Sequence, residues 1–326
     1  MGKKDIILTF DYEVFLGKSG TIEKCILEPV NLLLNVLDEA DIKGVFFIDI
    51  LHLVKLREVG NHKDFNKLKT NIQDLIKRGH FAELHIHPHW IDAVYDSNDR
   101  SWDLSENRFY KVSTLSKEQA KKIFHDGIEL LSSIGKEVQV TYEIKAFRAG
   151  GLCIQPFSDF REVLIDNNIL IESSVAPGLR NDDSIQSFDF SKSLKFEPYK
   201  FSEDPLVEVE SGPFIQFPLV LYKVSFIDKV LSKLQGESAA NSTFGDGNSV
   251  NKNNYKKVLF FDRFKSSSFL FSFDGDYYES ILFDRIAKSK LKTITFISHP
   301  KLLSANSLST IKKLSKSGDL NFKTFD

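Results

Sequence analysis

Short apolar runs alternate with longer segments of helical periodicity along most of the chain. Residues 6–10 are apolar except for Thr9, as is typical of a buried strand, and the run ends at Asp11. Leu33, Leu34 and Leu37 recur at helical spacing within residues 29–40. The same criteria predict strands over residues 44–48, 82–86, 142–147, 169–175 and 292–297, and helices over residues 65–77, 117–133, 157–167, 277–288 and 307–315. This alternation predicts an α/β chain with a largely parallel sheet or barrel and helices outside it.

Three segments are less regular. Residues 92–113 form a polar stretch that we expect to be a loop over the end of the third strand. Residues 194–222 are β-rich with a break at Gly212-Pro213, and residues 235–254 are rich in Gly, Ser and Asn, which favours a mobile loop. Because barrels of this length commonly form one unit, we expect a single domain over residues 1–326, with the β-rich segment as an addition in the middle of the chain.

Composition excludes some classes of protein. The formal net charge is −2 and charges of both signs are mixed along the chain, unlike the basic surface of a nucleic-acid binder. Two cysteines, Cys25 and Cys153, cannot make a disulfide framework and suit a reducing compartment. No stretch approaches the roughly 20 apolar residues of a membrane span, and the apolar run near the N-terminus is too short for a signal peptide. We therefore expect a soluble, cytoplasmic protein without a nucleic-acid partner; its oligomeric state is not predicted.

A cluster of histidines is the strongest chemical signal. His85, His87 and His89 lie within five residues, in a chain with eight histidines, directly after an apolar run. Neutral imidazole is a common ligand of zinc and similar ions, so the cluster predicts a metal site. The alternative is a solvated polar patch at the end of a strand. Alternation along an extended strand would place His85 and His87 on the same side.

Polar groups also follow other predicted strands. Asp11 and Glu13 follow the first strand with the same parity, roughly 7 Å apart along an extended chain. Arg148 follows a later strand, and His299 follows the last one. In parallel α/β folds, catalytic groups collect at the carboxyl ends of strands, so we expect these side chains to meet there.

Four motifs in this order resemble those of the polysaccharide deacetylase superfamily, also called the NodB-homology superfamily or family-four carbohydrate esterases. They are Thr-Phe-Asp-Tyr-Glu at residues 9–13, Gly-His at 79–80 leading to His-Ile-His-Pro-His at 85–89, Phe-Arg-Ala-Gly-Gly at 147–151 and His-Pro at 299–300. The resemblance covers nearly the whole chain. It implies a distorted (β/α) barrel of about seven strands and removal of an N-acetyl group from a sugar with a divalent metal ion, for which zinc is expected.

The resemblance also implies roles for single residues. Asp11 matches the general base, Arg148 the residue that holds this base, and His299 the general acid. The second Asp of the usual first motif is replaced by Tyr12, so the metal would be held by Glu13 together with two histidines four residues apart, His85 and His89.

Four further residues are candidates for substrate binding or for support of the site. His87 is left over by the four-residue spacing, and Trp90 follows the histidine run. Asp49 and Glu172 are carboxylates on or after neighbouring predicted strands, for which a purely structural role is about as well supported.

The substrate implied is an N-acetylated sugar or glycan precursor, carried on a nucleotide or a lipid and used in surface-polysaccharide biosynthesis. Three alternatives stay open. The chain could be another C–N amide hydrolase on the same barrel, an unrelated histidine-rich phosphoesterase, or a catalytically inactive glycan-binding homologue. The altered first motif allows the last of these.

Overall fold

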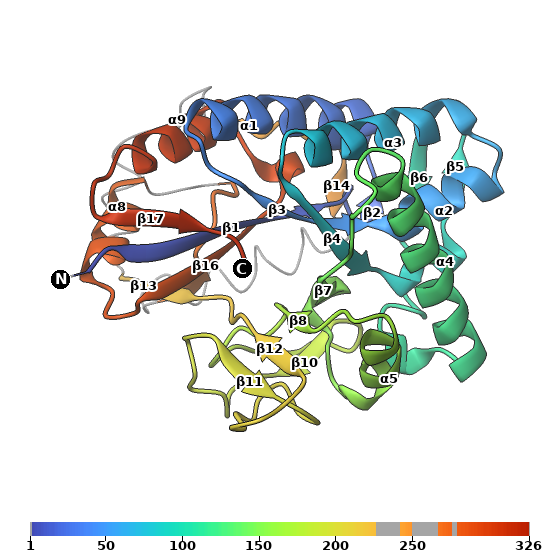
Figure 1. The fold of residues 1–326 in the computed structure, drawn as a ribbon. Helices are drawn as coiled ribbons and strands as arrows, with labels where there is room; N and C mark the ends of the chain where they lie inside the picture. The colour runs from blue at the N-terminus through green and yellow to red at the C-terminus, as the bar shows by residue number, and fades with distance from the viewer. Residues whose placement is uncertain (1, 226–241, 250–266, 276–278, 326) are drawn as a thin grey trace.

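A curled, mostly parallel β-sheet organises the protein (Figure 1). The computed structural model describes residues 2–225, 242–249, 267–275 and 279–325. The sheet contains nine strands, in chain order β1 (Lys4–Tyr12), β3 (Val45–Asp49), β4 (Phe81–Ile86), β7 (Ala146–Ala149), β8 (Ile171–Glu172), β11 (Tyr199–Phe201), β12 (Phe214–Gln216), β16 (Thr293–Ser298) and β17 (Leu320–Lys323). Their spatial order is β11-β12-β8-β7-β4-β3-β1-β16, and β17 also pairs with β1. Only β11 is antiparallel to its neighbour, so the prediction of an α/β chain with a largely parallel sheet is confirmed.

The curl brings the two ends of the parallel part of the sheet together. Beyond β12, Leu219 forms a parallel bridge with Thr295 of β16, and the Val220 N–H donates to the Thr295 carbonyl at 3.3 Å. This contact is an isolated bridge rather than a continuous ladder. The carboxyl ends of strands that are distant in sequence therefore surround a common centre.

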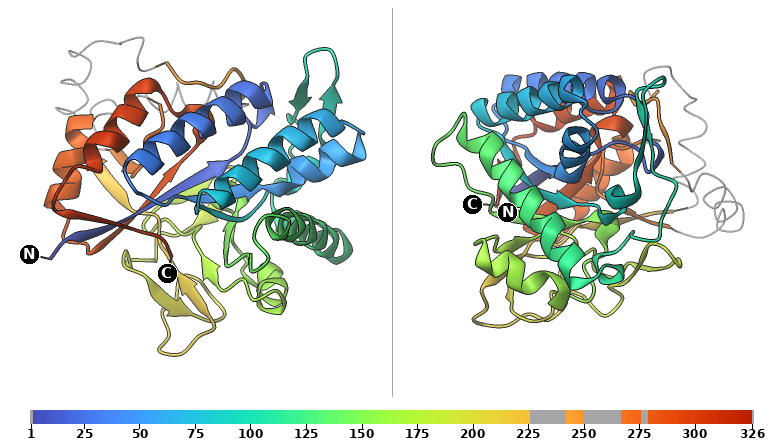
Figure 2. Two further views of the ribbon diagram at one scale, coloured as in Figure 1. Left: turned by 45° about the horizontal axis from the view of Figure 1, so that its top comes forward. Right: turned by 90° about the vertical axis from the view of Figure 1, so that its right-hand side faces the viewer.

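Helices cover the outer face of the sheet (Figure 2). They are α1 (Glu28–Glu39), α2 (Ile50–Glu58), α3 (His62–Lys77), α4 (Lys117–Lys136), α5 (Ser158–Asp166), α8 (Glu279–Lys288) and α9 (Ala305–Leu314). Leu33, Leu34 and Leu37 of α1 are all buried, as their spacing predicts. Helix α2 was not predicted: it begins at the residue after β3 and has only a weak separation of apolar and polar faces. Strand β17, near the C-terminus, was also not predicted.

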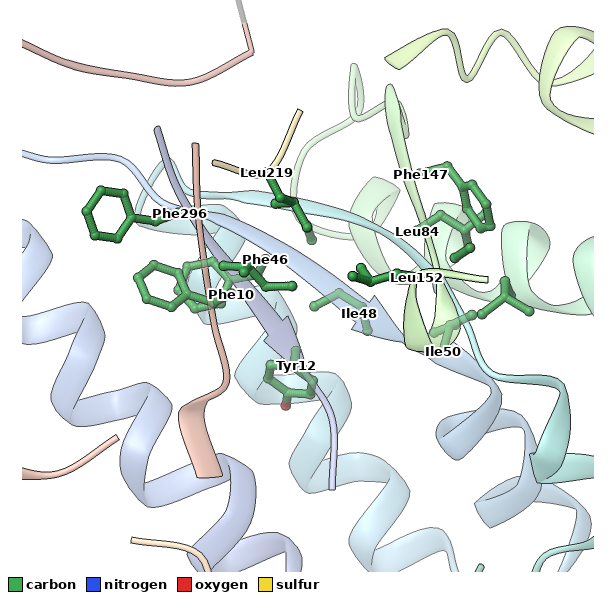
Figure 3. Packing of buried hydrophobic residues seen from close by; sticks show 14 of the residues in the cluster. Phe10, Tyr12, Phe46, Ile48, Ile50, Leu84, Phe147, Leu152, Leu219 and Phe296 are labelled. Carbon is green, nitrogen blue, oxygen red and sulfur yellow. The ribbon is translucent and has the colours of Figure 1, made fainter. Parts of the chain in front are cut away.

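The outward-pointing side chains of the strands form the main hydrophobic core with these helices (Figure 3). The rings of Phe10 on β1 and Phe46 on β3 lie 5.1 Å apart. Phe147 on β7 packs against Phe124 of α4 and Phe160 of α5, with centroid distances of 5.7 and 5.6 Å. Because successive side chains of a strand alternate between its faces, the neighbours of these residues point into the centre of the curled sheet.

The centre is apolar at one end and polar at the other. Val45, Phe47 and Ala146 are completely buried there, and Phe325 packs against them. Beyond Phe47, toward the carboxyl ends of the strands, the side chains are charged or polar. The guanidinium of Arg148 lies over the Phe47 ring at 4.0 Å. The apolar side chains therefore fill one end of the centre, and the polar side chains pack against them at the carboxyl ends of the strands.

The irregular segments are more ordered than predicted. Within the polar stretch 92–113, β5 (Val94–Asp96) and β6 (Ser101–Asp103) join β2 (Gly17–Lys18) and β14 (Asn248–Ser249) in a second sheet. Residues 194–222 contain β11, β12 and the start of β13 (Leu221–Val224), as the β-rich pattern predicts. Of the predicted mobile loop, residues 242–249 are described and lie against the protein through β14, whereas 235–241 and 250–254 lie outside the described residues.

Among the described helices, none combines the length and the apolar character needed to cross a bilayer.

Candidate functional site

The strand ends bring most of the predicted residues to one place. β1 ends at Tyr12 and β4 at Ile86, and the side chains next to these ends point into the centre of the curled sheet. The residues gathered there are Asp11, Glu13, Asp49, His85, His87, His89 and Arg148, all at most 6% exposed, and His299, whose side chain is 23% exposed. The expectation that polar groups at the strand ends meet is therefore confirmed by their positions.

Arg148 is completely buried and holds Asp11. Its Nη1 donates to Asp11 Oδ1, while Nη2 donates to Thr9 Oγ1 at 2.8 Å. Its Nε donates to the Ser173 carbonyl at 2.7 Å, and Nη2 also donates to Ser173 Oγ at 3.1 Å. The second oxygen of Asp11 points toward the site, 3.9 Å from His85 Nε2 and 3.8 Å from His299 Nε2. One carboxylate oxygen is thus anchored and the other faces the reaction space.

Glu13, His85 and His87 form a compact group of possible metal ligands. Glu13 Oε2 lies 2.7 Å from His87 Nε2 and 3.3 Å from His85 Nε2. One ligand atom from each of the three residues lies within 4.8 Å of the others. His85 Nδ1 donates to the Arg148 carbonyl at 2.8 Å, which turns Nε2 toward Glu13. Two imidazoles and a carboxylate are a known ligand set of catalytic zinc, so the residues present fit a divalent ion.

The electrostatics of this group favour an ionised carboxylate. Burial by itself would raise the pKa of Glu13, but the positive charge of Lys301, followed by the charge of His87 and by hydrogen bonds with His85 and His87, holds this pKa well below its usual range. Glu13 is therefore a carboxylate at neutral pH and can act as a ligand.

His89 lies outside this group, which differs from the predicted ligand set. It belongs to the short 3-10 helix η2 (Pro88–Asp92), where its ring is nearly parallel to those of Trp90 and Tyr110 at centroid distances of 5.8 and 6.2 Å. Within the described part of the chain, neither ring nitrogen has a hydrogen-bond partner, and burial keeps the pKa of His89 well below its usual range. His87, which the four-residue spacing leaves over, is the histidine that joins His85, as strand alternation indicates.

His299 is oriented by a carboxylate that the sequence did not indicate. Asp274 Oδ2 lies 2.6 Å from His299 Nδ1, and Asp274 Oδ1 accepts from the His299 backbone N–H at 2.7 Å. Burial disfavours the charged ring, but the charge and hydrogen bond of Asp274, with Glu13 and Asp11, raise the pKa of His299. The Nε2 atom faces the two carboxylates of the site. This arrangement suits a histidine that carries a proton to donate.

Lys301 also reaches the site and was not predicted. It follows His299-Pro300 in the 3-10 helix η7 (Pro300–Leu302) and is 4% exposed. Its ammonium donates to Glu13 Oε1 at 2.7 Å and to the Val14 carbonyl at 2.6 Å. A lysine two residues after a candidate histidine is too common a pattern to single out from sequence.

The other candidate residues divide between the site and the opposite face of the sheet. Asp49 Oδ2 accepts a hydrogen bond from the Trp90 indole at 2.6 Å, and its Oδ1 has no partner among the described residues. Burial raises the pKa of Asp49. Glu172, by contrast, pairs in register with Phe147, whose ring packs under α4 and α5. Paired residues share a face, so Glu172 points away from the centre, and the prediction that it lies near the site is corrected.

Comparisons with known proteins give no family assignment. No family model matches the chain, and no curated protein is significantly similar to it. Among solved structures, a protein from Mycobacterium smegmatis provisionally assigned as a polysaccharide deacetylase shares 15% identity over 98% of this chain and 87% of its own, with a TM-score of 0.47. The catalytic domain of a peptidoglycan N-acetylglucosamine deacetylase from Eubacterium rectale shares 13% identity over 100% of this chain and 90% of its own, with a TM-score of 0.41. The 4-alpha-glucanotransferase of Thermococcus litoralis has a TM-score of 0.49 at 14% identity, over 100% of this chain and 40% of its own. All three TM-scores lie below 0.5, so the function has to be argued from the site itself.

Proposed function

We propose that this protein is a metal-dependent deacetylase that hydrolyses the N-acetyl amide of a sugar or glycan precursor. The observation that carries the proposal is the meeting of three units in one buried site. These units are the ligand group Glu13–His85–His87, the carboxylate Asp11 held by Arg148, and His299 oriented by Asp274. Amide hydrolysis needs an electrophilic centre, a base and an acid, and each unit can supply one of them.

The residues have distinct tasks in this proposal. A divalent ion bound by Glu13, His85 and His87 would lower the pKa of water and polarise the amide carbonyl. Asp11 accepts the proton of the attacking water through Oδ2, because its Oδ1 is engaged by Arg148. His299 donates a proton to the leaving nitrogen, which departs as the amine of the sugar while the acyl group leaves as acetate.

The motif order supports the finer assignment. We infer that the curled sheet is the distorted barrel of the polysaccharide deacetylase superfamily and that this chain is a branch with Phe-Asp-Tyr-Glu in its first motif. We further propose zinc as the ion, and an N-acetylated precursor of a surface polysaccharide as the substrate. Asp49 has an unpartnered oxygen among the described residues, so it is the candidate to bind a substrate hydroxyl or amide.

Metal analysis of purified variants tests the ligand group. Glu13→Gln, His85→Ala and His87→Ala should each lose bound zinc, whereas His89→Ala should retain it. The exposed His125 on α4 provides the control His125→Ala. Loss of zinc from His89→Ala together with retention in His87→Ala would restore the ligand set predicted from sequence and overturn the one proposed.

Acetate release tests the reaction. The wild-type protein is assayed with N-acetylated nucleotide sugars and short N-acetylated oligosaccharides. Asp11→Asn should lower the rate by about 10²–10⁴-fold while leaving bound zinc in place, since it removes a base but no ligand. The exposed Asp182→Asn is the matched control. Full acetate release by Asp11→Asn would refute the assignment of the base.

A further inference from the structure

The ammonium of Lys301 occupies one oxygen of the candidate metal-binding carboxylate. Glu13 Oε1 accepts from Lys301 Nζ at 2.7 Å, whereas Glu13 Oε2 faces the imidazoles of His85 and His87. The two oxygens of one carboxylate therefore have different partners. A carboxylate can bind a metal through one oxygen or through both, and here the second oxygen is already engaged.

Several contacts hold Lys301 in this position. Nζ also donates to the Val14 carbonyl at 2.6 Å and lies 5.3 Å from the centre of the Phe15 ring. The Lys301 carbonyl accepts a hydrogen bond from the Gly245 N–H at 2.9 Å, which also holds the backbone of η7 in place. Because the side chain is only 6% exposed, the ammonium cannot turn into water without leaving two buried acceptors unpaired.

We propose that Lys301 is a positioning residue that restricts Glu13 to a single metal-binding oxygen and places a fixed positive charge beside the bound ion. This inference rests on the proposed metal site. The ammonium repels the ion and withdraws carboxylate charge from it, so metal binding is weaker than the ligand set alone would allow. In return, the ion keeps more of its positive charge and more open positions for water and the substrate carbonyl.

The charges around the site agree with this role. Asp11 is paired with Arg148 and Glu13 with Lys301, so each of these two carboxylates has its own buried cation. Arg148 does not touch Glu13 in any contact of the described residues, whereas Lys301 does, which makes Lys301 the cation that acts on the ligand group. A lysine needed only for packing would not have to place its ammonium on this carboxylate.

The test is a comparison of metal affinity in metal-stripped protein. Zn²⁺ binding is measured by calorimetry, and Co²⁺ binding by visible absorption, for the wild type, Lys301→Met and Lys301→Gln. Both variants remove the charge, and Gln keeps a donor for the Val14 carbonyl. Lys43→Met is the control, because Lys43 Nζ donates to the Arg78 carbonyl and makes no contact with the site.

We expect both Lys301 variants to bind Zn²⁺ at least about tenfold more tightly than the wild type, because the like charge is removed and the second oxygen is freed. Their Co²⁺ spectra should become weaker, as expected when a bidentate carboxylate raises the coordination number. Equal or weaker affinity in a folded variant would overturn the inference, since a merely structural lysine would give that result. A wild type that binds neither ion would instead refute the proposed metal site, and the inference with it.

A measurement on unmodified protein gives an independent check, in case neither variant folds. In a crystal structure of the Zn²⁺-loaded wild type, Glu13 should bind the ion through Oε2 alone, with Lys301 still on Oε1. Coordination of the ion by both oxygens would overturn the proposal.

Discussion

The pairing of Arg148 with Asp11 should dominate the stability of the site. The substitution Arg148→Met removes a completely buried guanidinium but keeps much of its volume. Asp11, 3% exposed, then loses its buried cation, and the hydrogen bonds to Thr9 and Ser173 are lost as well. Water cannot replace these partners without opening the centre of the sheet.

The expected cost follows from these contacts. Removing one member of a buried ion pair costs about 3–5 kcal/mol, and the lost hydrogen bonds add about 1 kcal/mol. We therefore expect the free energy of unfolding to fall by about 4–6 kcal/mol. At about 2.1 cal/mol/K per residue over 326 residues, the unfolding entropy is about 0.7 kcal/mol/K. The melting temperature should therefore fall by about 6–9 °C.

Urea denaturation and thermal melting of four proteins test this reasoning. They are the wild type, Arg148→Met, Asp11→Asn and the double variant. The double variant should be more stable than Arg148→Met by about 2 kcal/mol, because it no longer buries an unpaired charge. Arg108→Met is the control: the Arg108 side chain is 65% exposed, so the loss of its ion pair with Asp92 should destabilise the protein far less than Arg148→Met does. An Arg148→Met protein within about 1 kcal/mol of the wild type, or strict additivity of the two substitutions, would refute the argument.

Three further predictions concern other parts of the molecule. Burial lowers the pKa of His52 from 6.5 to about 3. Below pH 6.5 the unfolded chain therefore binds a proton that the native state does not bind, and the free energy of unfolding decreases as the pH is lowered. Urea denaturation at pH 7.5 and at pH 5 measures this effect. Between these two pH values, the free energy of unfolding of His52→Phe should decrease by about 2 kcal/mol less than that of the wild type. Asp274→Asn should lower the pKa of His299, which is measured by proton NMR of the metal-free protein. The same substitution should reduce the deacetylation rate at least about tenfold. Ser116 caps α4 through a reciprocal capping box, so Ser116→Ala should cost about 1 kcal/mol in urea denaturation.

The predictions for His52 and Ser116 have matched control variants. His125→Phe changes an exposed histidine and should leave the pH dependence of stability as it is in the wild type. Ser133→Ala alters an exposed position inside α4, where no cap is lost, and should not destabilise the protein. An acid sensitivity of His52→Phe equal to that of the wild type would contradict the first prediction. An unchanged pKa of His299 in Asp274→Asn would contradict the second, and a Ser116→Ala protein as stable as Ser133→Ala the third.

The histidine run shows what a local sequence pattern can predict about a site and what it cannot. An apolar strand followed by polar groups is visible in the sequence, and strand alternation pairs His85 with His87. The structure groups these two with Glu13. The four-residue spacing of the resemblance selects His89 instead, but the chain turns into a 3-10 helix at Pro88 and carries His89 toward Trp90. Spacing along a sequence describes a side chain's direction only while the backbone conformation stays regular.

The sequence by itself determined the alternation of strands and helices and the polar residues at the strand ends, because burial and periodicity are local properties. Because the carboxyl ends of parallel strands lie at one edge of a sheet, the sequence also places Asp11, His85 and Arg148 at that common edge. Only the tertiary structure decided that Asp274 and Lys301 join the site and that Glu172 faces the helices. These outcomes depend on strand register and on contacts between segments far apart in the chain. A shift of one residue reverses the side on which a strand residue lies, and no local pattern records it.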